Sequence, residues 1–168
     1  MLNKTAVIYY GGFLNKAGGV ISHVKALDLE MQRLGWEVKV YALESLPIWC
    51  RYFPHLVEKI TNFFNRPIGF LYKGLVTRFL YKTLFSREAD VLIFEDIYIS
   101  WVSKTPSVTL LHAVWSDNLQ AFDVSQKRLN RLKAAEVDLI NNIKHPLVTV
   151  SVPYMQFIKN ERLSTVRL

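Results

Sequence analysis

Short apolar segments that alternate with longer amphipathic stretches restrict the fold of this chain more than any other feature. The first segment, Lys4 to Tyr10 (KTAVIYY), is β-branched and aromatic and runs into Gly11 and Gly12, which is typical of a buried strand followed by a loop. Similar apolar segments are Trp36 to Leu43 (WEVKVYAL), Asp90 to Asp96 (DVLIFED), Ser107 to Trp115 (SVTLLHAVW) and Pro146 to Val152 (PLVTVSV). Each segment is predicted to be a β-strand.

Two amphipathic stretches between these segments predict helices. Hydrophobic side chains recur at steps of three and four from Val20 to Leu34, and Gly35 supplies a stop. From Asp123 to Ile143 a second helix is expected to begin with a capping box. Strands separated by helices pack best as a parallel sheet covered on each side. The sequence therefore predicts an α/β fold, a Rossmann-like parallel sheet with helices on both faces, in a single domain over residues 1–168.

Composition restricts the cellular setting. The chain has 168 residues and is 51% hydrophobic, which is enough for one buried core. The lone cysteine, Cys50, excludes an intramolecular disulfide, and the chain starts without a secretory leader. The longest apolar stretch, Ile68 to Phe85, is interrupted by charged residues and does not reach the roughly 18 residues of a membrane span. We therefore expect a cytoplasmic protein that does not cross a bilayer.

A parallel sheet would gather the polar residues that follow its strands. The carboxyl ends of all strands lie at one edge, and ligands bind outside that edge where the strand order reverses. The residues expected there are the loop Gly11 to Gly19, the pair Glu95 and Asp96, the stretch His112 to Asp117 (HAVWSD), and Ser151. Apart from one basic region of the chain, these segments contain most of the side chains that could take part in catalysis or polar binding.

The glycine pair Gly18-Gly19 directly precedes the first predicted helix. Its backbone N–H groups would lie at the positive end of that helix and would let a phosphate come close. His23 falls in the first turn, near the mouth of the same site. The alternative is that the glycines only form a tight turn and that His23 is an ordinary surface side chain.

His112 follows a predicted strand directly and is expected at the rim of the sheet. An imidazole there can donate to a developing oxyanion or leaving group, or can bond a substrate hydroxyl. The alternative is a buried histidine bonded to a backbone carbonyl. Glu95 and Asp96 could accept bonds from sugar hydroxyls or act as a base, or they could cap a helix beginning near Ile97.

Several other functions lack their sequence signatures. No cysteine or histidine cluster has metal-ligand spacing, so no metal is expected. A nucleophile elbow and a phosphate-binding lysine loop are also missing, which argues against hydrolases and P-loop nucleotidases. The glycine pairs do not form the G-x-G-x-x-G pattern of dinucleotide-binding proteins.

Most of the net charge of +7 lies in one segment, Arg51 to Arg87. It carries seven basic residues against Glu58 alone, a net charge of +6, and nine aromatic residues are interleaved with them. Such a composition is typical of a helix at the surface of an anionic membrane. The alternatives are nucleic-acid binding, for which no motif is present, and core aromatics with charged ends reaching solvent. The residues expected to face a membrane are Arg66, Lys73, Arg78 and Lys82.

Three elements in order resemble retaining glycosyltransferases of family 4 (GT4), which have the GT-B fold. They are AGGVISHV with its helix, Gly35 and WEVKVYAL; VTLLHAVWSD; and LVTVSVPYMQFI. The resemblance covers most of the chain apart from Pro47 to Arg87. It implies two Rossmann-like domains that face a cleft, the N-terminal one for the acceptor and the C-terminal one for a nucleotide sugar.

In that family Gly18 and Gly19 would approach the donor diphosphate and the transferred sugar, and His112 would bond the sugar or the reacting centre. The family needs no metal and no cofactor, since the nucleotide sugar is a co-substrate. The chain ends before the second, donor-binding domain, so it is expected to be inactive alone. The candidate site residues are His112 as the catalytic residue and, for donor or substrate binding, Gly18, Gly19, His23, Asp96, Trp115 and Ser151.

The basic segment and the resemblance together give a functional hypothesis. The chain is expected to be the acceptor-binding domain of a nucleotide-sugar-dependent glycosyltransferase that acts on a lipid-linked or cell-envelope glycan such as lipopolysaccharide. It would lie on the inner face of the cell membrane as a peripheral protein and would bind no nucleic acid. The alternative is a non-catalytic Rossmann-like module that binds a nucleotide or an anionic surface.

Overall fold

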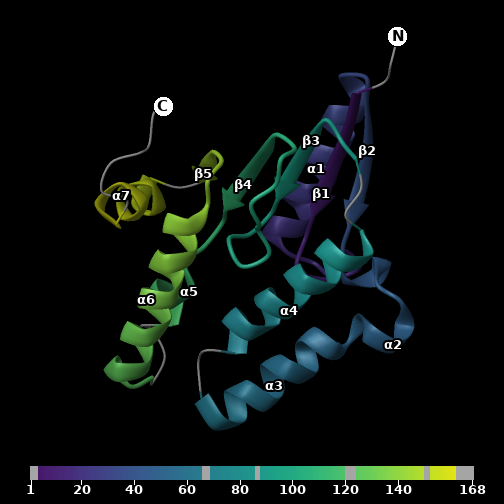
Figure 1. Cartoon of the computed structure of the whole chain (residues 1–168). Helices are drawn as coiled ribbons and strands as arrows, with labels where there is room; N and C mark the ends of the chain where they lie inside the picture. Colours follow the sequence, from purple (N-terminus) through teal and green to yellow (C-terminus); the bar gives the residue numbers. More distant parts are fainter. Residues whose placement is uncertain (1–3, 66–68, 86–87, 120–123, 150–151, 162–168) are drawn as a thin grey trace.

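The structure is a computed structural model that describes residues 4–65, 69–85, 88–119, 124–149 and 152–161. Five strands form one sheet in the order β2-β1-β3-β4-β5, and every neighbouring pair is parallel (Figure 1). The strands are β1 (Lys4–Tyr9), β2 (Trp36–Tyr41), β3 (Val91–Phe94), β4 (Ser107–Leu111) and β5 (Leu147–Thr149). The predicted α/β class and the Rossmann-like parallel sheet are therefore confirmed.

The strand order reverses next to β1. The chain runs from β1 outward to β2 and then returns to pair β3 with the other side of β1, in the register Ala6 with Val91 and Tyr9 with Phe94. In doubly wound sheets this switch point opens a crevice at the carboxyl ends of the two central strands. The loops that follow β1 and β3 therefore flank the position where such folds bind ligands.

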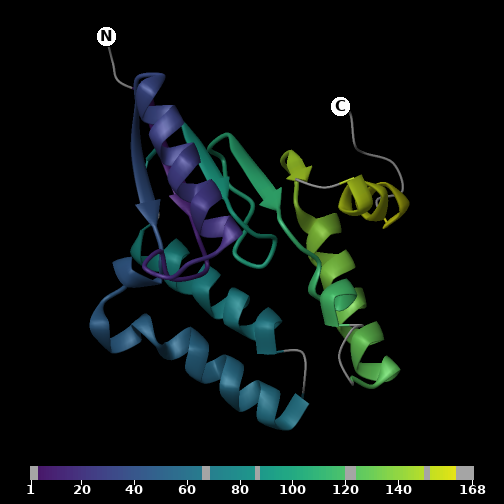
Figure 2. The same cartoon turned by 180° about the vertical axis from the view of Figure 1, so that it is seen from behind.

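Helices cover both faces of the sheet, because successive residues of β1 point to opposite sides. On one face Val7 and Tyr9 share a buried cluster with Tyr81 of α4 (Gly69–Leu84). On the other face Ile8 packs with Val24 of α1 (Gly19–Arg33). Figure 2 shows α1 lying across the strands, on the face opposite to the one seen in Figure 1.

The end of α1 differs slightly from the sequence prediction. Gly35 adopts a φ of 83°, a left-handed conformation that favours glycine, and it stops the helix as expected. Leu34, however, is 77% exposed, because it lies beyond the last helical residue and turns away from the sheet. The buried side chains of α1 are Ile21 and Val24.

The region from Pro47 to Leu84 forms a helical hairpin beside the carboxyl edge. After a single 3-10 turn, η1 (Leu43–Ser45), come α2 (Ile48–Arg51), α3 (Phe53–Asn65) and α4. Figure 1 shows α4 on the side toward which the strand arrowheads point, with α3 running along its outer side. Two bonds fix α4 to the loops after the central strands: Tyr81 donates to the Tyr10 carbonyl (2.7 Å) and Arg78 to the Ser100 carbonyl (3.3 Å).

Three described helices follow β4, and a buried carboxylate joins the first two of them. They are α5 (Trp115–Asn118), α6 (Gln126–Asn142) and α7 (Val152–Glu161). Glu136 of α6 is fully buried and accepts hydrogen bonds from the backbone N–H groups of Trp115 (2.8 Å) and Ser116 (3.2 Å) and from the Tyr98 hydroxyl. Burial raises the pKa of Glu136. This carboxylate caps the start of α5 and ties α6 to the loop after β3.

Several predicted boundaries change. α6 begins after Ser125, and the predicted cap Asp123 lies outside the described residues. The helix expected near Ile97 does not form; residues 95–99 are turns, and Asp96 Oδ1 accepts a bond from the Tyr98 N–H (3.3 Å). Among the described residues, no helix is long and apolar enough to cross a membrane.

Candidate functional site

A cleft opens at the carboxyl edge of the sheet, beside the switch point. Its volume is about 230 Å³. The loops after β1, β3 and β4 form one side, and α4 with Trp115 forms the other. The residues that line it and bear on its chemistry are Tyr10, Gly11, Gly12, Phe70, Lys73, Glu95, Asp96, His112 and Trp115.

Glu95 is the central polar side chain of the cleft. It is 2% exposed, and its Oε2 atom lies 2.7 Å from His112 Nε2 and 3.2 Å from His23 Nδ1. The two imidazole rings meet edge to face, with their centroids 5.0 Å apart. Because Glu95 directly follows β3, His112 directly follows β4 and His23 lies on α1, the fold alone brings the three together.

Asp96 lies beside Glu95 and also lines the cleft. Burial raises the pKa of Asp96 to about 7, although the N–H groups of Tyr98 and Ile97 and the charge of His112 act in the opposite direction. A carboxyl group with this pKa can accept or release a proton near neutral pH, which is the property of a general acid or base.

Two stacked rings form an aromatic part of the wall. Phe70 of α4 and Trp115 of α5 lie parallel, with centroids 4.1 Å apart and an interplanar angle of 7°. Glu136 fixes the position of Trp115 through its backbone N–H. Aromatic faces beside carboxylates and imidazoles suit a ligand that combines apolar ring faces with hydroxyl groups, as sugars do.

A second hollow adjoins the cleft and contains the glycine pair. Gly18, Gly19, Lys16 and His55 line it, and Tyr10, Gly12, Val20 and Lys73 line both hollows. Gly18 has an extended φ of 162°, and a Cβ added at Gly19 would meet nothing within 4 Å. The described structure therefore gives no internal reason for glycine at position 19, and the space before α1 stays open.

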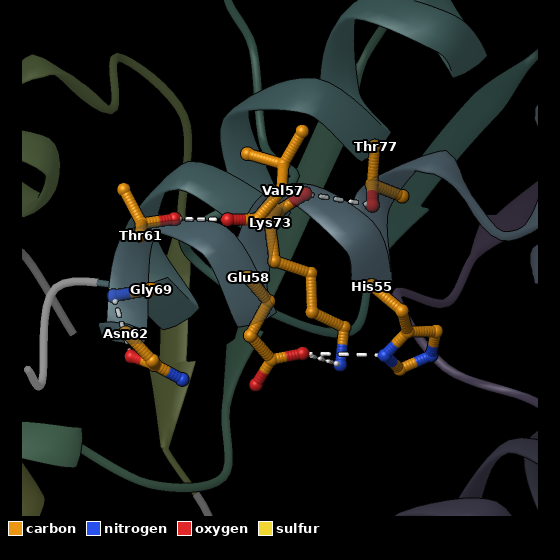
Figure 3. A network of polar contacts seen from close by, with 8 residues as sticks. All are labelled: His55, Val57, Glu58, Thr61, Asn62, Gly69, Lys73 and Thr77. Atoms are coloured by element: carbon orange, nitrogen blue, oxygen red, sulfur yellow. Dashed lines mark hydrogen bonds and ion pairs between the residues drawn. The ribbon is translucent and has the colours of Figure 1, made fainter. Parts of the chain in front are cut away.

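Lys73 lies between the two hollows and is held by residues of α3. Its Nζ atom lies 3.4 Å from Glu58 Oε2, which is also 3.2 Å from His55 Nδ1 (Figure 3). Burial lowers the pKa of His55, and the charge of Lys73 lowers it further. Lys73 therefore lines the cleft and also forms an ion pair between α4 and α3.

The structure brings together most of the candidate residues from the sequence. His112, Asp96 and Trp115 line the cleft; Gly18 and Gly19 line the adjoining hollow; and His23 contacts Glu95. Ser151 lies outside the described residues.

The residues predicted to face a membrane are placed differently from one another. Lys73 lines the cleft, and Arg78 donates to the Ser100 carbonyl (3.3 Å); both residues are partly exposed. Lys82 is exposed, and Arg66 lies outside the described residues.

The outer side of α2 and α3 instead exposes large apolar side chains. Trp49 is 80% exposed and Phe63 is 81% exposed. The other exposed apolar residues of α3 recur at steps of three and four, so they lie on one side of that helix. We call this surface the apolar face; it consists of Ile48, Trp49, Tyr52, Phe53, Leu56, Ile60, Phe63 and Phe64.

Sequence reasoning missed the role of Glu95 and the contribution of α4. Glu95 was interpreted as a sugar ligand, base or helix cap, whereas it joins two histidines that lie 72 and 17 residues away along the chain. His23, Glu95 and His112 place three possible metal-ligand atoms within 4.8 Å of one another. Local spacing could not reveal such a set, because His23 lies on α1 while Glu95 and His112 follow two different strands.

Comparisons of this chain with protein-family models, with curated proteins and with solved structures found no match.

Proposed function

We propose that this chain is the acceptor-binding domain of a retaining, nucleotide-sugar-dependent glycosyltransferase. One observation carries the proposal: the cleft at the switch point gathers His112, Glu95, Asp96 and the Phe70–Trp115 stack in a single space. Hydroxyl-binding groups and aromatic rings at the carboxyl edge of a parallel sheet are what a sugar acceptor requires. The resemblance to GT4 supports the same function.

In this proposal the cleft orients the acceptor. The oxygen of the acceptor hydroxyl bonds to the anomeric carbon of the donor sugar on the face from which the nucleoside diphosphate departs, so the configuration is retained. Asp96 accepts the proton of that hydroxyl, since its pKa of about 7 allows both protonation states near neutrality. His112, held by Glu95, bonds the transferred sugar or the reacting centre. Gly18 and Gly19 leave space at the start of α1 for the donor diphosphate, which a second domain across the cleft would carry.

The apolar face supports a lipid-linked acceptor at an anionic membrane. Its aromatic side chains suit the headgroup boundary of a bilayer, and Lys59 and Lys82 are exposed basic residues of the same hairpin. Apolar contact, more than the net charge of the segment, would supply the binding energy, because Lys73 is paired with Glu58 and Arg78 with the Ser100 carbonyl. The acceptor class proposed is a cell-envelope glycolipid such as a lipopolysaccharide precursor.

The second candidate is a non-catalytic module that binds a nucleotide or an anionic surface. The hollow beside Gly18 and Gly19 favours it, because Lys16 and Lys73 line that hollow next to the N-terminus of a helix. This candidate predicts nucleotide binding with no requirement for a glycan.

A transfer assay on the protein expressed from its natural reading frame tests the proposal. Nucleotide sugars serve as donors, lipid-linked glycans as acceptors, and mass spectrometry detects addition of one sugar to the acceptor. The proposal predicts a product that His112→Ala abolishes and that His145→Ala retains. A protein that binds nucleotides but yields no product with any donor and acceptor supports the second candidate instead.

A further inference from the structure

His23, Glu95 and His112 combine the ligand types of a transition-metal site. Two imidazole nitrogens, His23 Nδ1 and His112 Nε2, are directed at one carboxylate oxygen, Glu95 Oε2, at 3.2 Å and 2.7 Å. All three atoms lie within 4.8 Å of one another. Imidazole nitrogen and carboxylate oxygen together are typical ligands of Zn²⁺ and of related divalent ions.

The carboxylate has an unmet electrostatic requirement. The Glu95 side chain is fully buried, and its Oε1 atom has no hydrogen-bond partner among the residues that the structure describes. A buried acceptor without a partner destabilises the folded state, and more so when the group is charged. A bound cation would compensate the carboxylate and could also contact Oε1, whereas both histidine contacts are made to Oε2.

Two of the three distances among these atoms are close to what a metal requires, and the third is within 4.8 Å. Metal–ligand bonds of about 2.0–2.2 Å place neighbouring ligand atoms roughly 3.0–3.4 Å apart. The contact of His23 Nδ1 with Glu95 Oε2 (3.2 Å) lies within this range, and that of His112 Nε2 (2.7 Å) is slightly shorter. The His23 side chain is 37% exposed, so its ring can rotate to complete the set without disturbing the core.

We propose that His23, Glu95 and His112 bind a divalent transition-metal ion of the Zn²⁺ type. Three protein ligands leave a coordination position open, as in catalytic rather than structural zinc sites. Glu95 and His112 line the cleft, so an oxygen atom of a ligand in the cleft is the natural fourth ligand. This inference goes beyond the proposed function, because glycosyl transfer of the proposed kind needs no metal.

Titration of the metal-free chain with Zn²⁺ alone tests the site. The chain is first stripped with a chelator, and binding is followed by calorimetry; Co²⁺, whose visible absorption reports coordination, serves as a second probe. We expect one equivalent to bind. His23→Ala and His112→Ala should each weaken binding by at least about tenfold, and Glu95→Gln should do the same.

A matched control comes from the second histidine–glutamate pair. His55 Nδ1 lies 3.2 Å from Glu58 Oε2, the same distance as in the pair of His23 and Glu95, but no second histidine joins it. His55→Ala should therefore leave the affinity unchanged. Because the His23 side chain is partly exposed, His23→Ala should fold, and it still tests the site if Glu95→Gln fails to fold.

Two results would overturn the metal site: no saturable binding of either ion, or one-equivalent binding that both His23→Ala and His112→Ala retain. Neither result bears on glycan binding or sugar transfer, which are tested by separate assays. Conversely, metal binding without any transfer product would count against the glycosyltransferase proposal alone.

Discussion

His112 and Glu95 are joined across two neighbouring strands, with His112 Nε2 2.7 Å from Glu95 Oε2. Each residue directly follows its strand, so the pairing of β3 with β4 sets their positions at the edge of the sheet. Glu95 is buried, and His112 is partly exposed to the cleft. The carboxylate thus fixes the orientation of an imidazole that can still contact a ligand.

Glu136→Ala should be among the most destabilising single changes in the chain. The Glu136 carboxylate accepts bonds from Trp115 N–H, Ser116 N–H and the Tyr98 hydroxyl, and its removal leaves these buried donors without their acceptor. We expect the free energy of unfolding in urea to fall by about 3 kcal/mol. Glu30→Ala, which removes an exposed ion pair with Arg33, should cost less than about 1 kcal/mol. Equal effects of the two changes would contradict the capping role of Glu136.

Glu136 should also make stability depend on pH. Burial raises the pKa of its carboxyl group above the ordinary value of 4.5, so above that pH the folded chain binds more protons than the unfolded chain does. The free energy of unfolding should therefore decrease as pH rises from about 4.5 toward the raised pKa. Glu136→Gln removes this titration and should make that part of the profile less steep, leaving the contribution of Asp96, whose pKa is also raised. Glu30→Gln should leave the slope unchanged. An unchanged slope in Glu136→Gln would show that the pKa is not raised.

The sequence predicted the sheet well because buried strands and amphipathic helices leave local patterns. The apolar run before Gly11 and the helix ended by Gly35 both lie close to their predicted positions. The strand order could not be predicted, since β1 pairs with β3, which begins more than 80 residues further along the chain. Local patterns contain no information on such pairings.

The candidate site was predictable only in part, because its residues come from several elements of the fold. A parallel sheet places His112 and Asp96 at one edge, and the structure does so. The bond from His23 to Glu95 depends on the rotation of α1 over the sheet, which periodicity does not set to within one residue. Lys73 and Arg78 were predicted to face a membrane from composition alone, which could not reveal that Lys73 pairs with Glu58 of α3 or that Arg78 donates to the Ser100 carbonyl.

Gly19 and Gly35 should give opposite results when each is changed to valine. A side chain at Gly19 meets open space, so Gly19→Val should change the free energy of unfolding by less than about 1 kcal/mol. It should nevertheless abolish sugar transfer by filling the space for the donor diphosphate. Gly35→Val forces a φ of 83° on a branched residue, which should cost about 1–2 kcal/mol and leave transfer intact. Full transfer by Gly19→Val would contradict the close approach of a ligand.

The apolar face should control membrane binding. The paired change Phe63→Ala and Phe64→Ala removes two exposed rings from α3 and should strongly reduce sedimentation with anionic vesicles. Leu34→Ala with Val102→Ala removes exposed apolar side chains elsewhere and should leave sedimentation unchanged. Equal binding to neutral and anionic vesicles would remove the electrostatic part of the proposal. Self-association that the phenylalanine changes abolish, without any vesicle binding, would instead identify this face as a contact between copies of the chain.

Mapping of backbone amide shifts in NMR spectra of the 168-residue chain, during titration with a lipid-linked glycan, tests the central claim most directly. We predict saturable shifts confined to the cleft, around Gly11, Glu95, Asp96 and Trp115, with an affinity at least about tenfold weaker in His112→Ala. His145→Ala, which removes the contact with Thr109 Oγ1 (2.7 Å) away from the cleft lining, should retain the affinity. Shifts that avoid the cleft, or that persist unchanged in His112→Ala, would contradict the assignment of this edge of the sheet as the acceptor site.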